Sequence, residues 1–513
     1  MNEENSPLKD HWEEWMRVLL LGTDQASGTE QLVEWGATLG WEGEGMEQWI
    51  LEAIGKTALL RRVASPLGVK HEGVSISPAE TETTPLSARA IAHLKSLLYG
   101  EQRLALSEFL RLLHTTRKTI APEFLPDLVE TCFNDGTLFP MLLPAIGERG
   151  RWLVAQHPVW KIRLPGPAQY REWRMANTAE MKTLLTAYRQ NAPEEALQSL
   201  VAAWSDMDHK EKSRLLPALV AGLSQADEPF LETCLSEPRK EVRIAAAELL
   251  SRLPDSQLVS RCFHAARGIL NWGQNRMVVQ LPHEVPKSAA SDGIYPTGSK
   301  LPGGLPLNWA QQLVARIPIT YWTKHWEQPL APIIIAFTAA QYAKQWQWAL
   351  AESLLRFPNE EAARILIKWW LINAPLETWN APVVQDLLRQ TSNEVFNDAM
   401  IAWLEQAGPL VAEQSLGYWW LTLAQQEWSQ PLSKIIVLGF QDMVQSGKAH
   451  QHHLWHYRRL LEVASYQSDP ELMDTLKRGW AIGSSTIARW MPDLEKMWQT
   501  LHFRRDMRRT LLQ

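Results

Sequence analysis

The chain has 513 residues, 45% of them hydrophobic, and a formal net charge of -6. This length exceeds what one compact core usually holds, so several domains or one long repeat array are expected. The acidic balance excludes an overall attraction to nucleic acid or anionic lipid, and any such contact requires a local basic patch. Cys132, Cys234 and Cys262 lie far apart and form no C-x-x-C pair, which argues against a disulfide framework and a thiolate zinc site.

The beginning of the chain has no features of a secreted or membrane protein. Its first residues, MNEENSPLKDHWEEW, are acidic and polar, whereas a secretory signal has basic residues followed by an apolar run. The longest apolar run, 331–340, is about half of the ~20 residues that a membrane span needs. A cytoplasmic protein without a membrane segment is expected.

The N-terminal third is predicted to be helical with one break. Residues 1–64 are predicted to form an N-terminal helical segment, and residues 65–86, rich in Ser, Pro, Thr and Glu, a loop or linker. Helical patterns resume over residues 87–177, where Pro122 begins a unit that continues to Phe133.

Residues 178–270 carry the clearest pattern, and we expect HEAT-like repeats there. The segment from Asp227 to Ser256 is predicted to form two helices that fold back on each other. Apolar residues recur at the helical period along its second half: Val242, Ala245, Ala246, Leu249, Leu250 and Leu253. A single helical pair cannot bury such a stripe, so neighbours of the same kind and a stacked, extended α-solenoid are predicted.

The predicted array is interrupted once. Residues 271–307 contain a long Pro/Gly-rich loop, whose part from Gln274 to Pro306 has a composition that we expect to sustain neither helix nor sheet. Helical patterns return over residues 308–513, and no strand alternation is evident anywhere in the chain. The predicted fold is all-α, an irregular HEAT-like α-solenoid with a long inserted loop.

Tryptophan is the compositional outlier, with 26 residues. The second half contains many of them in helical patterns: Trp346, Trp348, Trp369, Trp370, Trp403, Trp419, Trp420 and Trp428. Most are expected to pack in the core, because burial is common for large aromatic side chains. The remainder could form a recognition surface.

Three stretches together resemble a bacterial family of HEAT-like proteins known as a domain of unknown function. They are RVLLLGTD (17–24), IGERGRWLVAQHPVWKI (146–162) and GLSQADEPFLETCLSEPRKEVRIAAAELLSRLPDSQLVSR (222–261). The resemblance implies no activity that transfers residue by residue. It implies a genomic context beside MoxR-type AAA+ ATPases, von Willebrand A proteins and SWIM zinc-finger proteins, in which a helical adaptor would be a natural component.

Two arginine groups are the candidate contacts for a partner or an anion. Arg149, Arg151 and Trp152 lie in GERGRWL, where guanidinium forks suit carboxylate or phosphate. The favoured alternative there is a structural turn with glycines, an internally paired arginine, and Trp152 and Trp160 as anchors. The final helix, FRRDMRRTLLQ, carries the second group: Arg504, Arg505, Arg508 and Arg509. Its favoured alternative is a solvated helix end whose cations complement the helix dipole.

Other motifs give no catalytic, cofactor or metal residues. The segment GIYPTGSK (293–300) has the lysine and hydroxyl in the wrong order for a phosphate-binding loop and follows no apolar strand. His452 and His456, in the cluster with His450 and His453, would share a helix face. They lack the H-E-x-x-H glutamate and a third ligand, so solvated surface histidines are favoured.

Three functional hypotheses remain open. The leading one is a non-enzymatic scaffold or adaptor that binds proteins, with a MoxR-type AAA+ ATPase or von Willebrand A protein as partner. The alternative is a HEAT-like nucleic-acid-binding protein or DNA glycosylase-like enzyme, which the tryptophans allow and the acidic balance opposes. In the third, the loop from Gln274 to Pro306 docks into a partner's groove.

Overall fold

The computed structural model describes residues 84–513 except 136, 158, 164–166, 275, 299–302, 409–415, 424–425, 447–453 and 481–484, together with residues 16, 18, 20, 34, 37, 48, 51–52 and 54–56. The chain divides into two compact units, Met1–Ser77 and Pro78–Gln513. The described residues of the first unit are helical. The other residues up to 83 lie outside the described part of the chain. They include most of the predicted helical segment over 1–64 and nearly all of the predicted loop over 65–86.

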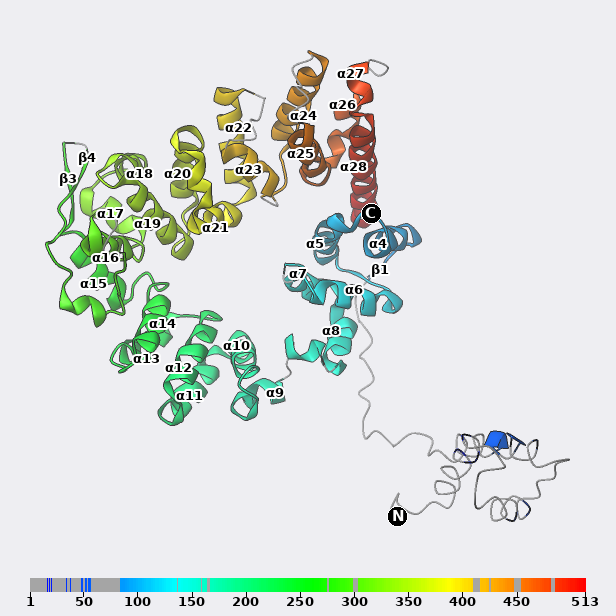
Figure 1. Ribbon diagram of the computed structural model, residues 1–513, viewed down its shortest axis with the longest axis horizontal. Coiled ribbons are helices and arrows are strands. Elements are labelled where there is room, and N and C mark those ends of the chain that lie inside the picture. The colour runs from blue at the N-terminus through cyan, green and yellow to red at the C-terminus, as the bar shows by residue number, and fades with distance from the viewer. Residues whose placement is uncertain are drawn as a thin grey trace. The chain divides into compact units, whose positions relative to one another are not determined.

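The second unit is built from helices, as predicted, with two short pairs of strands (Figure 1). Its first part contains β1 (Thr84–Pro85), α4 (Ala88–Tyr99), α5 (Leu106–Thr116), β2 (Lys118–Thr119), α6 (Leu125–Phe133), α7 (Phe139–Ala145) and α8 (Gly147–Gln156). There follow α9 (Pro167–Arg171), α10 (Met181–Asn191), α11 (Pro193–Ala203), α12 (His209–Leu215), α13 (Glu228–Cys234), α14 (Lys240–Leu250), α15 (Gln257–Ala266), β3 (Leu270–Gly273) and β4 (Arg276–Val279).

The remaining helices complete the unit. They are α16 (Gly304–Val314), α17 (Ile319–Trp326), α18 (Leu330–Ala339), α19 (Ala343–Arg356), α20 (Glu360–Asn373), α21 (Pro382–Gln390), α22 (Asn393–Ala407), α23 (Leu416–Leu423), α24 (Gln430–Gln445), α25 (Leu454–Gln467), α26 (Met473–Lys477), α27 (Ser485–Ala488) and α28 (Met491–Leu512). Several begin with proline in the first turn, as α11, α13 and α21 do, where the missing N–H costs no hydrogen bond.

The predicted pair of helices between Asp227 and Ser256 is confirmed as α13 and α14. Val242, Ala246 and Leu250 of α14 are fully buried in the main hydrophobic core. The repeats are also joined by a buried ion pair between Arg189 of α10 and Asp227, 2.9 Å apart, with both side chains almost inaccessible to solvent. Arg189 also donates hydrogen bonds to four carbonyl oxygens of neighbouring turns, those of Pro193, Leu219, Ala221 and Gly222.

The strands correct two predictions. β1 pairs with β2 in parallel, and β3 forms an antiparallel hairpin with β4. The expectation that the chain contains no strands was therefore wrong. The hairpin lies partly within the loop that was expected to sustain no regular structure. The prolines and glycines of this predicted loop are concentrated after residue 281. β3 and β4 instead include the buried residues Leu270 and Met277, which attach the hairpin to the helices.

The rest of this loop is also packed against the repeats. Ile294 is 1% exposed, and Tyr295 Oη accepts a hydrogen bond from Arg243 Nε of α14 at 2.8 Å. Arg261 of α15 forms an ion pair with Asp292 at 2.8 Å. Gly293, with a φ of 67°, lies so close to Arg243 that a β-carbon would be 2.7 Å from its carbonyl oxygen. The described part of the GIYPTGSK segment therefore covers α14.

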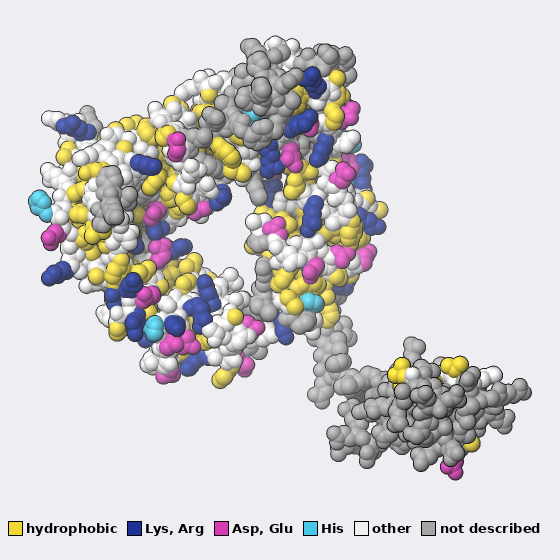
Figure 2. Space-filling model, in the orientation of Figure 1, with side chains coloured by type: hydrophobic (Ala, Val, Ile, Leu, Met, Phe, Trp, Pro, Cys, Tyr) yellow, Lys and Arg dark blue, Asp and Glu magenta, His cyan; other side chains and the backbone are white. Residues whose placement is uncertain are grey.

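The helical array of the second unit closes on itself. From α4 onward each helix contacts others near it in the chain, and the last helix, α28, contacts α25 and α26 as well as α4 and α5. Figure 1 shows α28, in red, beside α4 and α5, in blue. Figure 2 shows this unit hollowed at its centre, inside the circuit of helices. The predicted all-α array of stacked helices is confirmed, but it closes on itself instead of remaining extended.

The two ends of α28 lie in different hydrophobic cores. Leu494, Met497 and Leu501 belong to the main core, which begins at Tyr170. Met507 and Leu511 belong to a second core formed by residues 86–160. The helix thus joins the last part of the unit to the first, and the apolar surface that it covers on both sides stabilises the closure.

The prediction that most of these tryptophans pack in the core is confirmed. Trp346, Trp370, Trp403, Trp420 and Trp428 are buried, and Trp348, Trp369 and Trp419 are partly buried against the same core. The indole nitrogens of some have internal acceptors: Trp370 Nε1 donates to Gln347 Oε1 at 2.9 Å.

Candidate functional sites

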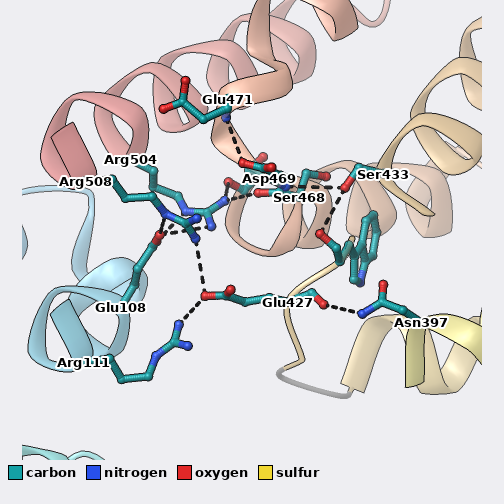
Figure 3. Close-up of polar contacts among 12 residues, drawn as sticks. Glu108, Arg111, Asn397, Glu427, Ser433, Ser468, Asp469, Glu471, Arg504 and Arg508 are labelled. Carbon is teal, nitrogen blue, oxygen red and sulfur yellow. Dashed lines mark hydrogen bonds and ion pairs between the residues drawn. The ribbon is translucent and has the colours of Figure 1, made fainter. Parts of the chain in front are cut away.

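Two of the arginines predicted on the final helix, Arg504 and Arg508, form the polar part of the circuit's closure (Figure 3). Arg504 is 1% exposed, and its Nε donates to Glu108 Oε2 of α5 at 2.6 Å. Its Nη1 donates to the carbonyl oxygens of Ser465 and Ser468 at 2.9 and 2.8 Å. Because a buried guanidinium requires acceptors for its donors, this arrangement lets Arg504 lie between the two cores.

Arg508, one turn further along α28, extends the cluster. It pairs with Glu108 and, at 3.4 Å, with Glu427, which also accepts a hydrogen bond from Arg111 of α5 at 2.5 Å. Burial alone would raise the pKa of the Glu427 carboxyl, but the charges of Arg111 and Arg508 outweigh it and hold that pKa below its ordinary value. Burial opposes the charge of Arg508, but the carboxylate of Glu108 dominates and raises the guanidinium pKa.

A second polar contact joins α28 to α4. Asp506 Oδ2 accepts a hydrogen bond from Arg89 Nε at 2.9 Å and lies 2.8 Å from His93 Nε2. Desolvation is the largest influence on His93 and lowers its pKa, although Asp506 acts in the opposite direction. These contacts fix the orientation of α28 on α4.

All four predicted arginines of α28 bind carboxylates within the chain. Arg505 pairs with Asp474 at 2.7 Å and Arg509 with Glu471 at 2.5 Å, in addition to the partners of Arg504 and Arg508. The expectation of a solvated helix end is wrong for Arg504, whose guanidinium is buried and enclosed by acceptors of this chain. Sequence reasoning missed Glu108 and Glu427, because no spacing connects residues separated by up to 400 positions.

Arg149, Arg151 and Trp152 lie on a different helix, α8. Arg151 is exposed, and its Nε donates to the carbonyl oxygen of Leu143 at 3.4 Å, while Trp152 is half-buried. The expected turn is present at one glycine, Gly147, which has a φ of 63°. Gly150, however, is a buried helical position where a β-carbon would be 2.4 Å from Ile146 Cβ. This region is a packed junction that presents one exposed arginine, Arg151.

The three cysteines and His456 are buried in the packed interior. Burial raises the pKa of Cys132, Cys234 and Cys262 to about 12, so these thiols are poor nucleophiles at neutral pH. His456 is 2% exposed and packs edge-on against Tyr418, so the expectation of a surface histidine is wrong for it. His450, His452 and His453 lie outside the described residues. In the described part of the chain, no three His, Cys, Asp or Glu side chains are grouped so as to hold a metal ion.

A groove beside the β3–β4 hairpin is a candidate binding site. It has a volume of about 560 Å³ and lies between the hairpin and α18. Its walls include Trp272, Arg276, Met277, Val278, Val279, Gln328, Pro332, Ile335, Ala336, Ala339, Ala340 and Gln341. Ile335 is 51% exposed there. Sequence reasoning identified the surrounding loop but not the groove, because α18 and the hairpin meet only in the folded chain.

The hairpin wall of the groove is held by aromatic packing. The ring of Trp272 in β3 lies 5.4 Å from that of Trp326, which in turn lies 4.7 Å from Trp322, both in α17. Trp326 also contacts Phe337 of α18, with ring centroids 6.1 Å apart. These contacts connect both walls of the groove through one aromatic cluster, so its shape is largely preformed.

None of the described helices combines the length and the hydrophobicity that a membrane-spanning helix needs. No curated protein and no solved structure matches this chain. A family model does match, over residues 14–511, and its extent agrees with the resemblance seen in three separate stretches of the sequence. The chain therefore belongs to the family of unknown function designated DUF5691.

Proposed function

We propose that this protein is a non-enzymatic scaffold that binds a protein partner through the groove between the β3–β4 hairpin and α18. The observation that supports it is the groove itself, with Ile335 half exposed at its wall. Exposed apolar surface that lines a concave site is typical of partner or ligand binding. The closed circuit of helices provides a frame that keeps the groove in place.

The class of partner comes from the sequence resemblance. It implies a genomic context with MoxR-type AAA+ ATPases and von Willebrand A proteins, and we propose one of these as the partner. In this arrangement the MoxR-type ATPase hydrolyses ATP, and the present chain positions whichever of the two proteins it binds.

Direct binding between purified proteins tests the proposal. Isothermal titration of the full chain with the MoxR-type ATPase and the von Willebrand A protein of the same genome should give a saturable complex with one of them. Ile335→Asp should weaken it by about tenfold or more, because a charge then faces apolar contacts. Ile372→Asp is the matched control, since Ile372 of α20 is equally exposed, at 50%, and lies outside the groove.

Two results would overturn the scaffold proposal. One is the absence of binding to both proteins. The other is salt-sensitive binding of an alkylated DNA duplex together with release of the damaged base, which would establish the glycosylase-like alternative.

A further inference from the structure

The outer edge of β4 carries backbone groups that β3 does not use. β3 and β4 form a two-stranded antiparallel sheet in which Trp272 lies opposite Met277 and Leu270 opposite Val279. Just beyond the ladder, Gln280 N donates to Ile269 O at 2.8 Å, which makes that pair a hydrogen-bonded one. Hydrogen-bonded and non-hydrogen-bonded pairs alternate along an antiparallel ladder, so Met277 and Val279 direct their N–H and C=O groups away from β3.

These outward groups have no backbone partner within the described chain. The strand pairing places β4 beside β3 alone, and no hydrogen bond from Met277 or Val279 reaches another described residue. Unpaired strand edges of this kind are templates for an added strand. Here the outer edge of β4 borders a groove and has no neighbouring strand in the described part of the chain.

The groove fits the side chains of such a strand. Its opposite wall is α18, with Pro332, Ile335, Ala336 and Ala339, and its volume of about 560 Å³ lies in the range of ligand pockets, ~300–1,000 Å³. β4 has four residues and therefore offers an edge of roughly 13 Å, at ~3.3 Å per residue. A short extended segment is the occupant that uses both the edge and the apolar wall.

The charge of the groove defines the occupant further. Arg276, at the start of β4, is exposed and is the one charged residue in the described lining of the groove. An acidic side chain or a terminal carboxylate on the added segment would complement its guanidinium.

We propose that the outer edge of β4 binds an extended peptide segment of a protein partner, which adds as a third strand. Alternate apolar side chains of the segment pack on Ile335 and Ala336 of α18, and an acidic group pairs with Arg276. Main-chain hydrogen bonds to Met277 and Val279 give affinity, and the groove gives specificity, as in other cases of strand addition. This inference rests on the proposed scaffold function and specifies the chemistry of its partner.

A displayed library of random 12-residue peptides, selected on the full chain, tests the proposal. The selected peptides should alternate apolar residues and carry an acidic residue, with affinities measured by fluorescence anisotropy. N-methylation of a peptide backbone nitrogen that faces β4 should weaken binding by about tenfold, because one hydrogen bond is lost and its acceptor is left unpaired.

Variants of the chain provide the complementary measurement. Val279→Pro removes an outward N–H without removing a hydrogen bond to β3, and should weaken binding by about tenfold, whereas Val279→Thr retains the N–H and should not. Arg276→Glu should reverse the preference for acidic peptides. The helical circular dichroism signal shows whether each variant folds. If Val279→Pro does not fold, the N-methylated peptides test the proposal on the unchanged chain.

Each remaining outcome overturns strand addition. Peptides that bind equally well after N-methylation would bind through their side chains alone, without main-chain hydrogen bonds to β4. A concentration-dependent dimer abolished by Val279→Pro would make a second copy of this chain the occupant. If the ATPase or von Willebrand A protein binds the chain but Val279→Pro and Arg276→Glu leave that binding unchanged, the scaffold function stands and the strand-addition site is wrong.

Discussion

At the scale of single residues, Arg504 shows why a charge can be retained in the interior of a helical protein. Its guanidinium is surrounded by the Glu108 carboxylate and two carbonyl oxygens, so most of its hydrogen-bonding capacity is used. A buried pair of this kind is weak evidence for net stabilisation, since desolvation opposes the attraction. Removal of one partner of the pair, however, leaves the charge of the other partner buried and uncompensated.

We therefore expect Glu108→Gln to lower the free energy of unfolding by about 3–5 kcal/mol, measured by urea denaturation. The matched control is Glu471→Gln, which removes the partner of Arg509 on the same helix. Both side chains of that pair are largely exposed, at 42% and 59%, and the expected loss is at most about 1 kcal/mol. Equal losses in the two variants would show that burial of Arg504 has no energetic consequence.

At the scale of elements, the helices were predictable where apolar residues recur at the helical period. The helices α20 and α24, for example, lie in residues 308–513, where helical patterns were predicted. The hairpin was missed because β3 and β4 are four residues each, too short for a clear alternation. Their pairing depends on Leu270 and Met277 reaching the core.

Close approach between α22 and α23 is an element-level constraint that the sequence does not show. A β-carbon on Gly417 of α23 would lie 2.4 Å from the ring of Trp403 in α22. We expect Gly417→Ala to destabilise the protein by about 1–3 kcal/mol, because the buried ring must shift. A lower thermal unfolding midpoint would show this.

Gly268→Ala serves as the control for that variant. Its added methyl group would meet the carbonyl oxygen of Ala265 at 3.5 Å, an ordinary contact. The midpoint of this variant should be unchanged or slightly higher, because alanine restricts the unfolded chain. A Gly417→Ala protein as stable as Gly268→Ala would mean that the helix pair adjusts without cost.

At the scale of the whole second unit, α28 is the element that makes the array continuous. It joins helices about 400 positions apart in the sequence, and its last turns supply Met507 and Leu511 to the core of residues 86–160. A solenoid with free ends needs terminal caps to cover its exposed faces. Here each end of the array covers the other.

Met507→Asp should open this closure, because an unpaired carboxylate is costly in an apolar core. Hydrogen exchange measured by mass spectrometry should then be faster in α4 and α5 and unchanged in α14. Leu512→Asp is the control on the same helix, since Leu512 is 65% exposed. Unchanged exchange in α4 and α5 of the Met507→Asp protein would contradict a closure that depends on this contact.

The sequence by itself determined the all-α class, the α13–α14 repeat and the burial of most of the tryptophans considered, because these follow from local periodicity and from side-chain hydrophobicity. The tertiary structure decided that the array closes, that Arg504 and Arg508 of α28 bind Glu108 and Glu427, and that β4 borders a groove. Those features depend on contacts between residues far apart in the chain, and the spacing of residues in a sequence carries no record of which distant surfaces meet when it folds.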